Sequence, residues 1–360
     1  MAESSEEQPA PELIDVRPDE RFDENRVADY LAGKLDGSDR PLTVRQFGGG
    51  HANLTYLLCY GEGDGAVEYV LRRPPLGPVA ATSHDMSREY RVLSKLWRSF
   101  LLAPRAYLYC DDATIIGSDF FVMERRHGVV VRHVIPEQFG GGADPVANRK
   151  LSEVVIDNLV DFHAVDPESV GLEALGKPAG FLERQVTGWA GRFERAKTWE
   201  IPAAEEVKTW LVDNLPPPSR ATLVHNDWRL DNMAVAEDDP GRCVAVYDWD
   251  MCTLGDPLCD VGTLLGVWSD RGEDPAGNNP MPTQSPGFMS RAEAAKRYCE
   301  RTGCDPDAIP YYVVFGTFKM AVVLQQIFYR FHQGQTQDER FVELGKLAEG
   351  LFVLASERRG

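Results

Sequence analysis

The sequence has few cysteines, and no two of them have the spacing of a metal-binding motif. Its seven cysteines are scattered over 360 residues without a Cys-x-x-Cys motif. We therefore expect neither a disulfide framework nor a zinc site, and a reducing cytoplasmic location.

Basic stretches are also lacking. The chain carries 38 Lys and Arg against 56 Asp and Glu, a formal net charge of −18. Proteins that bind nucleic acid use Lys and Arg to neutralise phosphates, so we expect no nucleic-acid partner. The acidic excess is typical of a soluble surface, and a cationic ligand is the alternative reading.

Long apolar runs are absent as well. The most apolar stretch, residues 311–329, is interrupted by Lys319 and two glutamines, which favours a buried helix over a membrane span. We expect no membrane partner. Residues 1–23 begin with an acidic segment that has no apolar core, so they predict a disordered tail and no signal peptide.

Hydropathy patterns divide the remainder into two lobes. Residues 24–125 predict a small antiparallel β-sheet with a helix at 24–35 and another that starts after Ser83 as N-cap and runs to about Trp97. Residues 126–360 predict a mostly helical lobe, in which Asp144 and Pro145 open a long helix. Its expected helices are 145–165, 181–199, 203–214, 257–268, 291–302, 309–331 and 338–356. The fold class is therefore α+β.

The most informative segment lies between His225 and Asp250. Asp227 and Asn232 share one short polar loop, and Asp248 follows the apolar strand pattern Val-Ala-Val-Tyr. Phosphoryl-transfer sites often combine one carboxylate that takes the proton of the acceptor with an amide and another carboxylate that hold Mg²⁺. The spacing predicts these roles for Asp227, Asn232 and Asp248.

The motif His225-x-Asp227-x-x-x-x-Asn232, followed by Asp248-Trp249-Asp250 and by Gly255-Asp256-Pro257-x-x-Asp260, resembles the aminoglycoside phosphotransferase family, whose members are related to protein kinases and choline kinases. The segments from Arg229 to Asn232 and from Met251 to Pro257 look most like the kinase-like domains fused to some acyl-CoA dehydrogenases and like their free-standing bacterial relatives. The resemblance covers most of the chain and implies a two-lobed, protein-kinase-like fold.

The resemblance also implies a nucleotide site. It assigns a phosphate loop to Gly48, Gly49, Gly50, His51, Ala52 and Asn53, and an interlobe adenine-binding hinge to Met123, Glu124 and Arg125. Arg72 stands where kinases carry a lysine, with Glu89 as the expected ion-pair partner and Arg73 as a nearby competitor. ATP with Mg²⁺ is the expected cofactor, and GTP stays an alternative.

The remaining candidates surround the acidic motifs. We expect His225 and Asp260 to brace the catalytic loop, while Asp250 has either a capping or a supporting role. Arg229 and Asp231 are candidate acceptor contacts, although solvated loop residues have the same pattern. Trp268 is a candidate acceptor contact or a core residue.

The expected function is transfer of the γ-phosphate of ATP to a hydroxyl of a small molecule or acyl thioester. A hydroxyacyl-CoA and an aminoglycoside are candidate acceptors, and the sequence defines neither the acceptor nor the oligomeric state. Arg72 and Ala52 depart from the usual pattern and motivate a non-catalytic nucleotide-binding module as one alternative. A metal-dependent phosphoesterase that uses His225, Asp227, Asp248 and Asp250 is the other.

Overall fold

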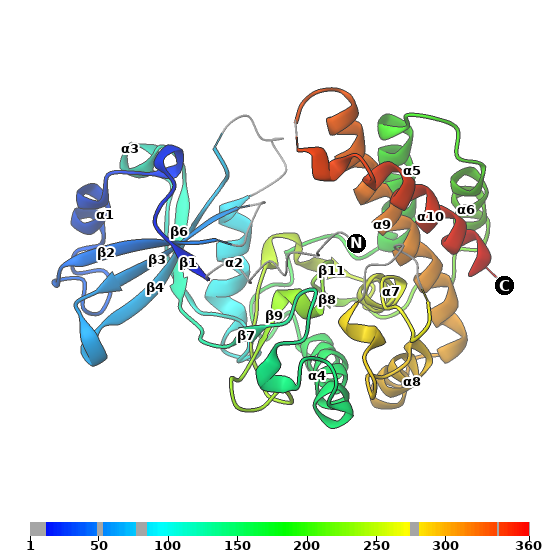
Figure 1. Cartoon of the computed structure of the whole chain (residues 1–360), viewed down its shortest axis with the longest axis horizontal. Helices are drawn as coiled ribbons and strands as arrows, with labels where there is room; N and C mark the ends of the chain where they lie inside the picture. The colour runs from blue at the N-terminus through cyan, green and yellow to red at the C-terminus, as the bar shows by residue number, and fades with distance from the viewer. Residues whose placement is uncertain (1–11, 49–52, 77–84, 274–280, 337, 360) are drawn as a thin grey trace, which may run out of the picture. The chain divides into compact units, whose positions relative to one another are not determined.

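A computed structural model describes residues 12–48, 53–76, 85–273, 281–336 and 338–359 of the chain (Figure 1). The chain divides into two compact units. Unit 1 runs to Arg126 and includes Asp248–Asp250, while unit 2 contains His127–Tyr247 and Met251–Gly360. One unit is built on a β-sheet and the other is mostly helical, which confirms the predicted α+β class.

Unit 1 is built around a six-stranded antiparallel sheet in the order β1-β2-β3-β4-β6-β5 (Figure 1). Its strands are β1 (Leu13–Ile14), β2 (Leu42–Phe47), β3 (Leu54–Tyr60), β4 (Val67–Arg73), β5 (Ala106–Cys110) and β6 (Phe120–Glu124). Its helices are α1 (Glu24–Leu31), α2 (Met86–Leu96) and the short α3 (Ala113–Ile116).

The alternating pattern of the strands explains how the sheet is covered. Successive side chains in a strand point to opposite faces. Leu71 therefore joins Val27 and Leu31 of α1 in one buried cluster with Tyr56 of β3. The next residue, Arg72, faces the other way and contacts Glu89 of α2. One strand thus serves the core on one face and presents a charge on the other.

The segment predicted as a disordered tail is partly ordered. Residues 12–23 contain β1, which pairs Leu13 with Phe47, and a 3-10 turn at Pro18–Glu20. Gln46 bonds to this segment by accepting from the Arg17 backbone N–H at 3.0 Å. The prediction is therefore wrong for residues 12–23, because their polar groups bond the edge strand; residues 1–11 lie outside the described part.

Both predicted helices of unit 1 have different ends. The first stops at Leu31, shortly before Gly33 adopts a left-handed φ of 72°. The second starts at Met86 and is capped by Asp85, whose side chain accepts the Arg88 N–H at 3.1 Å. The expected cap, Ser83, lies outside the described residues.

Unit 2 is mostly helical. Its helices are α4 (Pro145–His163), α5 (Phe181–Ala196), α6 (Pro202–Asp213), α7 (Leu258–Gly266), α8 (Arg291–Thr302), α9 (Ile309–His332) and α10 (Leu344–Glu357). Its short strands are β7 (Val129–Val130), β8 (Thr222–Val224), β9 (Met233–Val235), β10 (Cys243–Val246) and β11 (Thr253–Gly255). They form a three-stranded sheet β10-β9-β7 and the pair β11-β8.

Two glycines bring α7 and α9 into close contact. A Cβ placed on Gly262 would lie 2.1 Å from the Tyr312 carbonyl oxygen, and one on Gly316 would lie 2.0 Å from the Gly262 oxygen. The backbones of the two helices therefore approach where neither residue carries a side chain. This crossing holds α9 against the helix that carries Asp260.

The apolar helix predicted at 309–331 is α9, a core element of unit 2. By length and composition alone, Pro306–His332 is the one candidate membrane span within the described ranges. However, 67% of its most apolar window is buried inside the protein. Packing against α5, α7 and α10 explains its composition.

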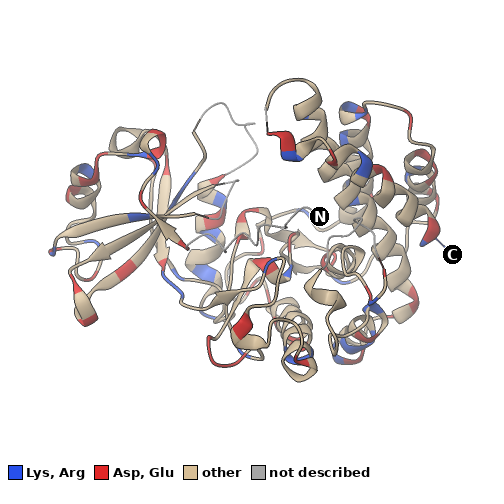
Figure 2. Cartoon of the chain, viewed as in Figure 1, with Lys and Arg blue, Asp and Glu red and all other residues tan. Residues whose placement is uncertain are grey.

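Other expectations for unit 2 need adjustment. The helix predicted at 338–356 starts only at Leu344, because Asp338 caps a 3-10 turn at Glu339–Phe341 instead. Cys299 and Cys304 are joined as a disulfide, which the scattered cysteines did not predict. Figure 2 shows acidic and basic residues interspersed along the ribbons of each unit.

Candidate functional site

In unit 2, the buried carboxylate of Asp260 fixes the loop that follows β8. Asp260 lies on α7 and accepts the backbone N–H of His225 at 2.6 Å and that of Asn226 at 2.7 Å. The His163 ring nitrogen Nε2 lies 3.2 Å from the same carboxylate. Burial pushes the pKa of Asp260 upward, but the hydrogen bond and charge of His163 outweigh it and leave that pKa below its usual range.

Asn226 turns the chain sharply just before Asp227. It is one of two described non-glycine residues with a left-handed backbone, at a φ of 68°. Its side-chain amide donates to the Met251 carbonyl at 2.9 Å, and its own carbonyl accepts from Lys319 Nζ at 2.6 Å. Such a conformation costs about 1–3 kcal/mol and persists because these contacts stabilise it.

The turn brings Asp227 and Asn232 together. The Asn232 side-chain amide donates to the Asp227 carboxylate at 2.7 Å and to the Asp227 backbone carbonyl at 2.9 Å. Both donor positions of the amide are thereby used. The amide oxygen is then the Asn232 atom suited to a hard cation such as Mg²⁺.

Two buried aromatic side chains, His225 and Trp228, anchor this loop to neighbouring segments of unit 2. The buried His225 ring bonds the Tyr247 carbonyl through Nε2 at 3.0 Å and accepts the Asp227 N–H through Nδ1 at 3.3 Å. Trp228 is buried, donates to the Val155 carbonyl at 3.0 Å and stacks on Phe162. His225 therefore links the Asp227 backbone to the Tyr247 carbonyl.

Arg229 and Asp231 bind each other at the rim of the loop. Two guanidinium nitrogens of Arg229 contact the two carboxylate oxygens of Asp231. Arg229 also lies 4.0 Å from the Asp227 carboxylate. Its side chain is 40% exposed, so a ligand has access to the guanidinium.

Unit 1 contains a second charged cluster, around Arg72. The Arg72 guanidinium lies 3.1 Å from the Glu89 carboxylate and also contacts Asp248. Trp249 is fully buried, and its ring packs edge-to-face on Phe100. Its backbone N–H donates to the Glu89 carboxylate at 3.4 Å. Asp248 itself has a left-handed φ of 66°.

The charges of this cluster depend on one another. Burial alone lowers the pKa of Arg72, but Glu89 and Asp248 outweigh it, so Arg72 stays a cation. Burial raises the pKa of the Glu89 carboxyl, and Arg72 opposes that rise. The charge of Asp250, in the turn at Trp249–Met251, acts on both groups.

Arg73 does not share this environment. It is the next residue of β4 and points to the opposite face, where Tyr56 and Glu20 lie near it. It is 3% exposed, and its Nε has no hydrogen-bond partner. The geometry thus separates the two arginines that the sequence left as competitors.

The predicted nucleotide loop is only partly described. Gly48 donates its N–H to the Glu12 carbonyl at 3.0 Å, and Asn53 is buried. Gly49, Gly50, His51 and Ala52 lie outside the described residues.

The predicted hinge ends β6. Met123 is buried, the Glu124 N–H donates to the Arg105 carbonyl at 2.8 Å, and Arg125 pairs with Glu12 at 2.8 Å. The Glu124 N–H is therefore used within the sheet.

Trp268 has the environment of a core residue. It is 2% exposed, and its indole N–H donates to the Met289 carbonyl at 2.8 Å. Its ring packs against Phe288. The structure therefore supports a core role for Trp268 and does not support an acceptor contact.

Two residues of the loop environment, Lys319 and Asn226, were not among the predicted site residues. Lys319 was visible as a charge that interrupts an apolar helix, which is a signal for a buried polar contact. Asn226 had no comparable signal, because its left-handed backbone depends on partners from distant segments.

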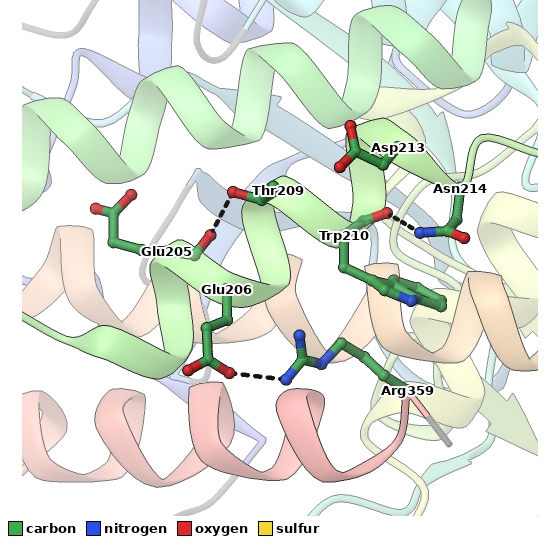
Figure 3. Close-up of a pocket in the computed structure, with 7 residues that line it drawn as sticks. All are labelled: Glu205, Glu206, Thr209, Trp210, Asp213, Asn214 and Arg359. Carbon is green, nitrogen blue, oxygen red and sulfur yellow. Dashed lines mark hydrogen bonds and ion pairs between the residues drawn. The ribbon is translucent and has the colours of Figure 1, made fainter.

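A surface hollow of unit 2 lies away from this loop (Figure 3). It measures about 520 Å³ and is lined by Glu205, Glu206, Thr209, Trp210, Asp213, Asn214 and Arg359. Arg359 reaches across from the end of α10 to Glu206 at 2.8 Å (Figure 3). No residue of the predicted site lines it.

Comparison with known proteins shows the family to which the chain belongs. Residues 43–284 match the phosphotransferase enzyme family, and the chain belongs to that family. It is 31% identical over 355 residues to acyl-CoA dehydrogenase family member 11 of Gallus gallus, a match that covers 95% of this chain and 44% of that protein. The human protein of the same name is 30% identical over 339 residues, covering 91% of this chain and 42% of that protein. The chain thus spans less than half the length of these relatives.

Solved structures of kinase-like phosphotransferases share the fold of this chain, which confirms the expected two-lobed, protein-kinase-like α+β fold. A Ralstonia eutropha protein, provisionally named an aminoglycoside phosphotransferase, superposes with a TM-score of 0.79 at 28% identity and covers 94% of this chain and 98% of its own. Choline kinase from Cryptosporidium parvum superposes with a TM-score of 0.61 at 11% identity, covering 94% of this chain and 95% of its own. The second likeness concerns the fold alone.

Proposed function

We propose that this chain is a small-molecule kinase that transfers the γ-phosphate of ATP to a hydroxyl group. The observation that carries the proposal is the loop in unit 2 where Asn232 donates to the Asp227 carboxylate at 2.7 Å. In a chain of the phosphotransferase family, this pairing supports Asp227 as the group that orients the acceptor hydroxyl and accepts its proton.

The cofactor part of the proposal rests on the donor set. The Asn232 amide oxygen and the Asp248 carboxylate suit Mg²⁺, which prefers oxygen ligands and would neutralise phosphate charge when bound. Arg72 keeps its positive charge and has a planar guanidinium that matches phosphate oxygens. The proposed phosphate contacts are therefore Arg72 and the segment from Gly48 to Asn53.

The acceptor is proposed at the level of its class. The matched acyl-CoA dehydrogenase family members make a hydroxylated acyl thioester the first acceptor to test. The provisional name of the Ralstonia eutropha protein makes an aminoglycoside the second. The acidic net charge of −18 favours the second, because it attracts cations. The proposed location remains the cytoplasm.

A non-catalytic nucleotide-binding module is the alternative with a specific observation behind it. Arg72 is paired with both Glu89 and Asp248, so the guanidinium proposed to bind phosphate already has two protein partners. Nucleotide binding without transfer to any hydroxylated acceptor would favour this module. The phosphoesterase alternative lacks such support, and two tightly bound metal ions without nucleotide would be needed to revive it.

Thermal unfolding with Mg²⁺ and ATP, GTP or neither tests the nucleotide part. A ligand that binds only the folded protein at 100 times its Kd stabilises it by about 2.7 kcal/mol. We expect a rise in Tm that requires both Mg²⁺ and nucleotide, followed by product formation in a panel of hydroxyacyl-CoA and aminoglycoside acceptors. No rise at millimolar nucleotide would contradict the proposal.

A further inference from the structure

Lys319 is a buried cation at the centre of α9, and its contact is with the predicted catalytic loop. Among the described residues it is the one lysine that is buried, with 7% of its surface exposed. Its neighbours Phe315, Phe318 and Val322 are all apolar core residues. A lysine in such surroundings loses the hydration of its ammonium group, which costs several kcal/mol unless partners replace the water.

The partner of Lys319 is a backbone atom beside the proposed base. Lys319 Nζ donates to the Asn226 carbonyl oxygen at 2.6 Å. That carbonyl belongs to the peptide plane that joins Asn226 to Asp227, whose N–H is bonded to His225 Nδ1 at 3.3 Å. Both ends of this one peptide plane are therefore held by side chains.

Asn226 is held by three different segments of unit 2. Asp260 on α7 takes its N–H, the Met251 carbonyl takes its side-chain amide, and Lys319 on α9 binds its carbonyl. Rotating the peptide plane that joins Asn226 to Asp227 breaks the Lys319 bond to the carbonyl and the His225 bond to the N–H. The orientation of the Asp227 side chain depends on this plane.

The charges around Lys319 also favour its position. Asp227 and Asp260 stabilise the ammonium charge, while burial lowers the pKa of Lys319 and Arg192 adds to that lowering. The ring of Trp189 lies 5.6 Å from Nζ and provides a further favourable contact for a cation. The ammonium thus interacts electrostatically with two carboxylates of the loop environment, Asp227 and Asp260.

We propose that Lys319 is a positioning residue, which fixes the Asn226–Asp227 peptide plane so that the Asp227 carboxylate faces the acceptor hydroxyl. The inference rests on the proposed function, because it assumes that Asp227 is the base of a phosphotransferase. Lys319 acts through the loop and contacts neither phosphate nor acceptor.

The discriminating variant is Lys319→Met. Methionine has a similar length and no charge, so it removes the hydrogen bond and also the cost of burying an ammonium group. We expect an unchanged or higher Tm, a kcat at least tenfold lower, and an unchanged KM for ATP. A merely structural lysine would give a lower Tm and leave kcat unchanged.

Two further variants complete the design. Lys319→Arg keeps a donor and a charge, and we expect it to recover part of the lost kcat. Gln325→Met is the matched control on the same helix, because Gln325 is equally buried but bonds the Ala196 carbonyl and Thr198. We expect Gln325→Met to lower the Tm and to leave kcat unchanged.

Hydrogen–deuterium exchange separates this inference from the proposed function, because it needs no acceptor. We expect the amides of residues 225–232 to exchange faster in Lys319→Met than in the wild type, with no such change in Gln325→Met. Unchanged exchange in that segment would overturn the positioning role even if the protein is a kinase. Faster exchange in Lys319→Met, together with a wild type that transfers no phosphate to any acceptor, would support the loop contact and contradict the proposed function alone.

Discussion

The Asp260 carboxylate accepts the backbone N–H of Asn226 at 2.7 Å, from a position that is fully buried in unit 2. A second N–H, that of His225, binds the other carboxylate oxygen. One side chain on α7 therefore fixes two consecutive peptide groups immediately before Asp227. The geometry of the predicted catalytic loop is thus a property of the core of unit 2.

Asp260→Asn is expected to destabilise the protein by roughly 3 kcal/mol at neutral pH, since it replaces a paired, buried carboxylate by an amide with one acceptor. The pKa of Asp260 is lowered in the folded protein. Its contribution to stability is therefore complete above the unfolded pKa of about 3.9 and is lost as the pH falls through the folded pKa.

Denaturant unfolding of the wild type and the Asp260→Asn variant between pH 8 and pH 3 checks this prediction. The difference in unfolding free energy should stay constant down to about pH 5 and shrink below it. Asp161→Asn is the matched control, because Asp161 is 59% exposed and pairs with Arg301 on the surface. Its effect should stay within about 0.5 kcal/mol. A difference that grows toward acid pH would contradict the account.

Arg72 is expected to be the arginine that nucleotide binding requires. Arg72→Met should weaken the binding of Mg²⁺ and ATP at least tenfold, because it removes the charge paired with Glu89 and Asp248. Arg72→Lys should recover most of the affinity, since it restores a cation. Isothermal titration calorimetry measures both.

Arg73→Met is the control for the Arg72 variants. Arg73 lies on the opposite face of the sheet and is equally buried, so its replacement should leave the Kd for ATP unchanged. If Arg73→Met lost ATP binding while Arg72→Met retained it, Arg73 and not Arg72 would be the phosphate contact.

The helix crossing of α7 and α9 predicts a sharp difference between two glycines. Gly316→Ala should destabilise unit 2 by more than about 3 kcal/mol, because a Cβ there would lie 2.0 Å from the Gly262 carbonyl oxygen. Gly350→Ala on α10 should stabilise by about 0.5–1 kcal/mol, because that position is exposed and open. Thermal unfolding measures both variants. An unchanged Tm in Gly316→Ala would contradict the close backbone contact between α7 and α9.

The sequence predicted best where short-range chemistry decides the structure. The alternating pattern predicts strands at 42–47 and 54–60, and β2 and β3 have these bounds. Helix α4 begins at Pro145 after the Asp144 cap, as predicted. The α8 helix has its predicted bounds because Ser290 and Glu293 form a capping box at its start and Gly303 ends it.

Prediction failed where distant contacts decide. The ordering of residues 12–23 depends on Gln46 and Phe47 of β2, which no local pattern reveals. The role of Lys319 depends on the fold bringing α9 to Asn226, 93 residues away in the chain. The motif spacing nevertheless placed Asp227 beside Asn232, because both lie on one short loop.

The most direct test of the account is γ-phosphate transfer by the wild type and by Asp227→Asn under identical conditions, with ATP binding measured in parallel. The amide keeps the size of the carboxylate and an acceptor oxygen for Asn232, so we expect an unchanged Tm and retained nucleotide binding. General-base catalysis typically contributes about 10²–10⁴-fold, and kcat for phosphorylation of a hydroxylated acceptor should fall by that factor. An Asp227→Asn protein that transfers phosphate at the wild-type rate would contradict the central claim.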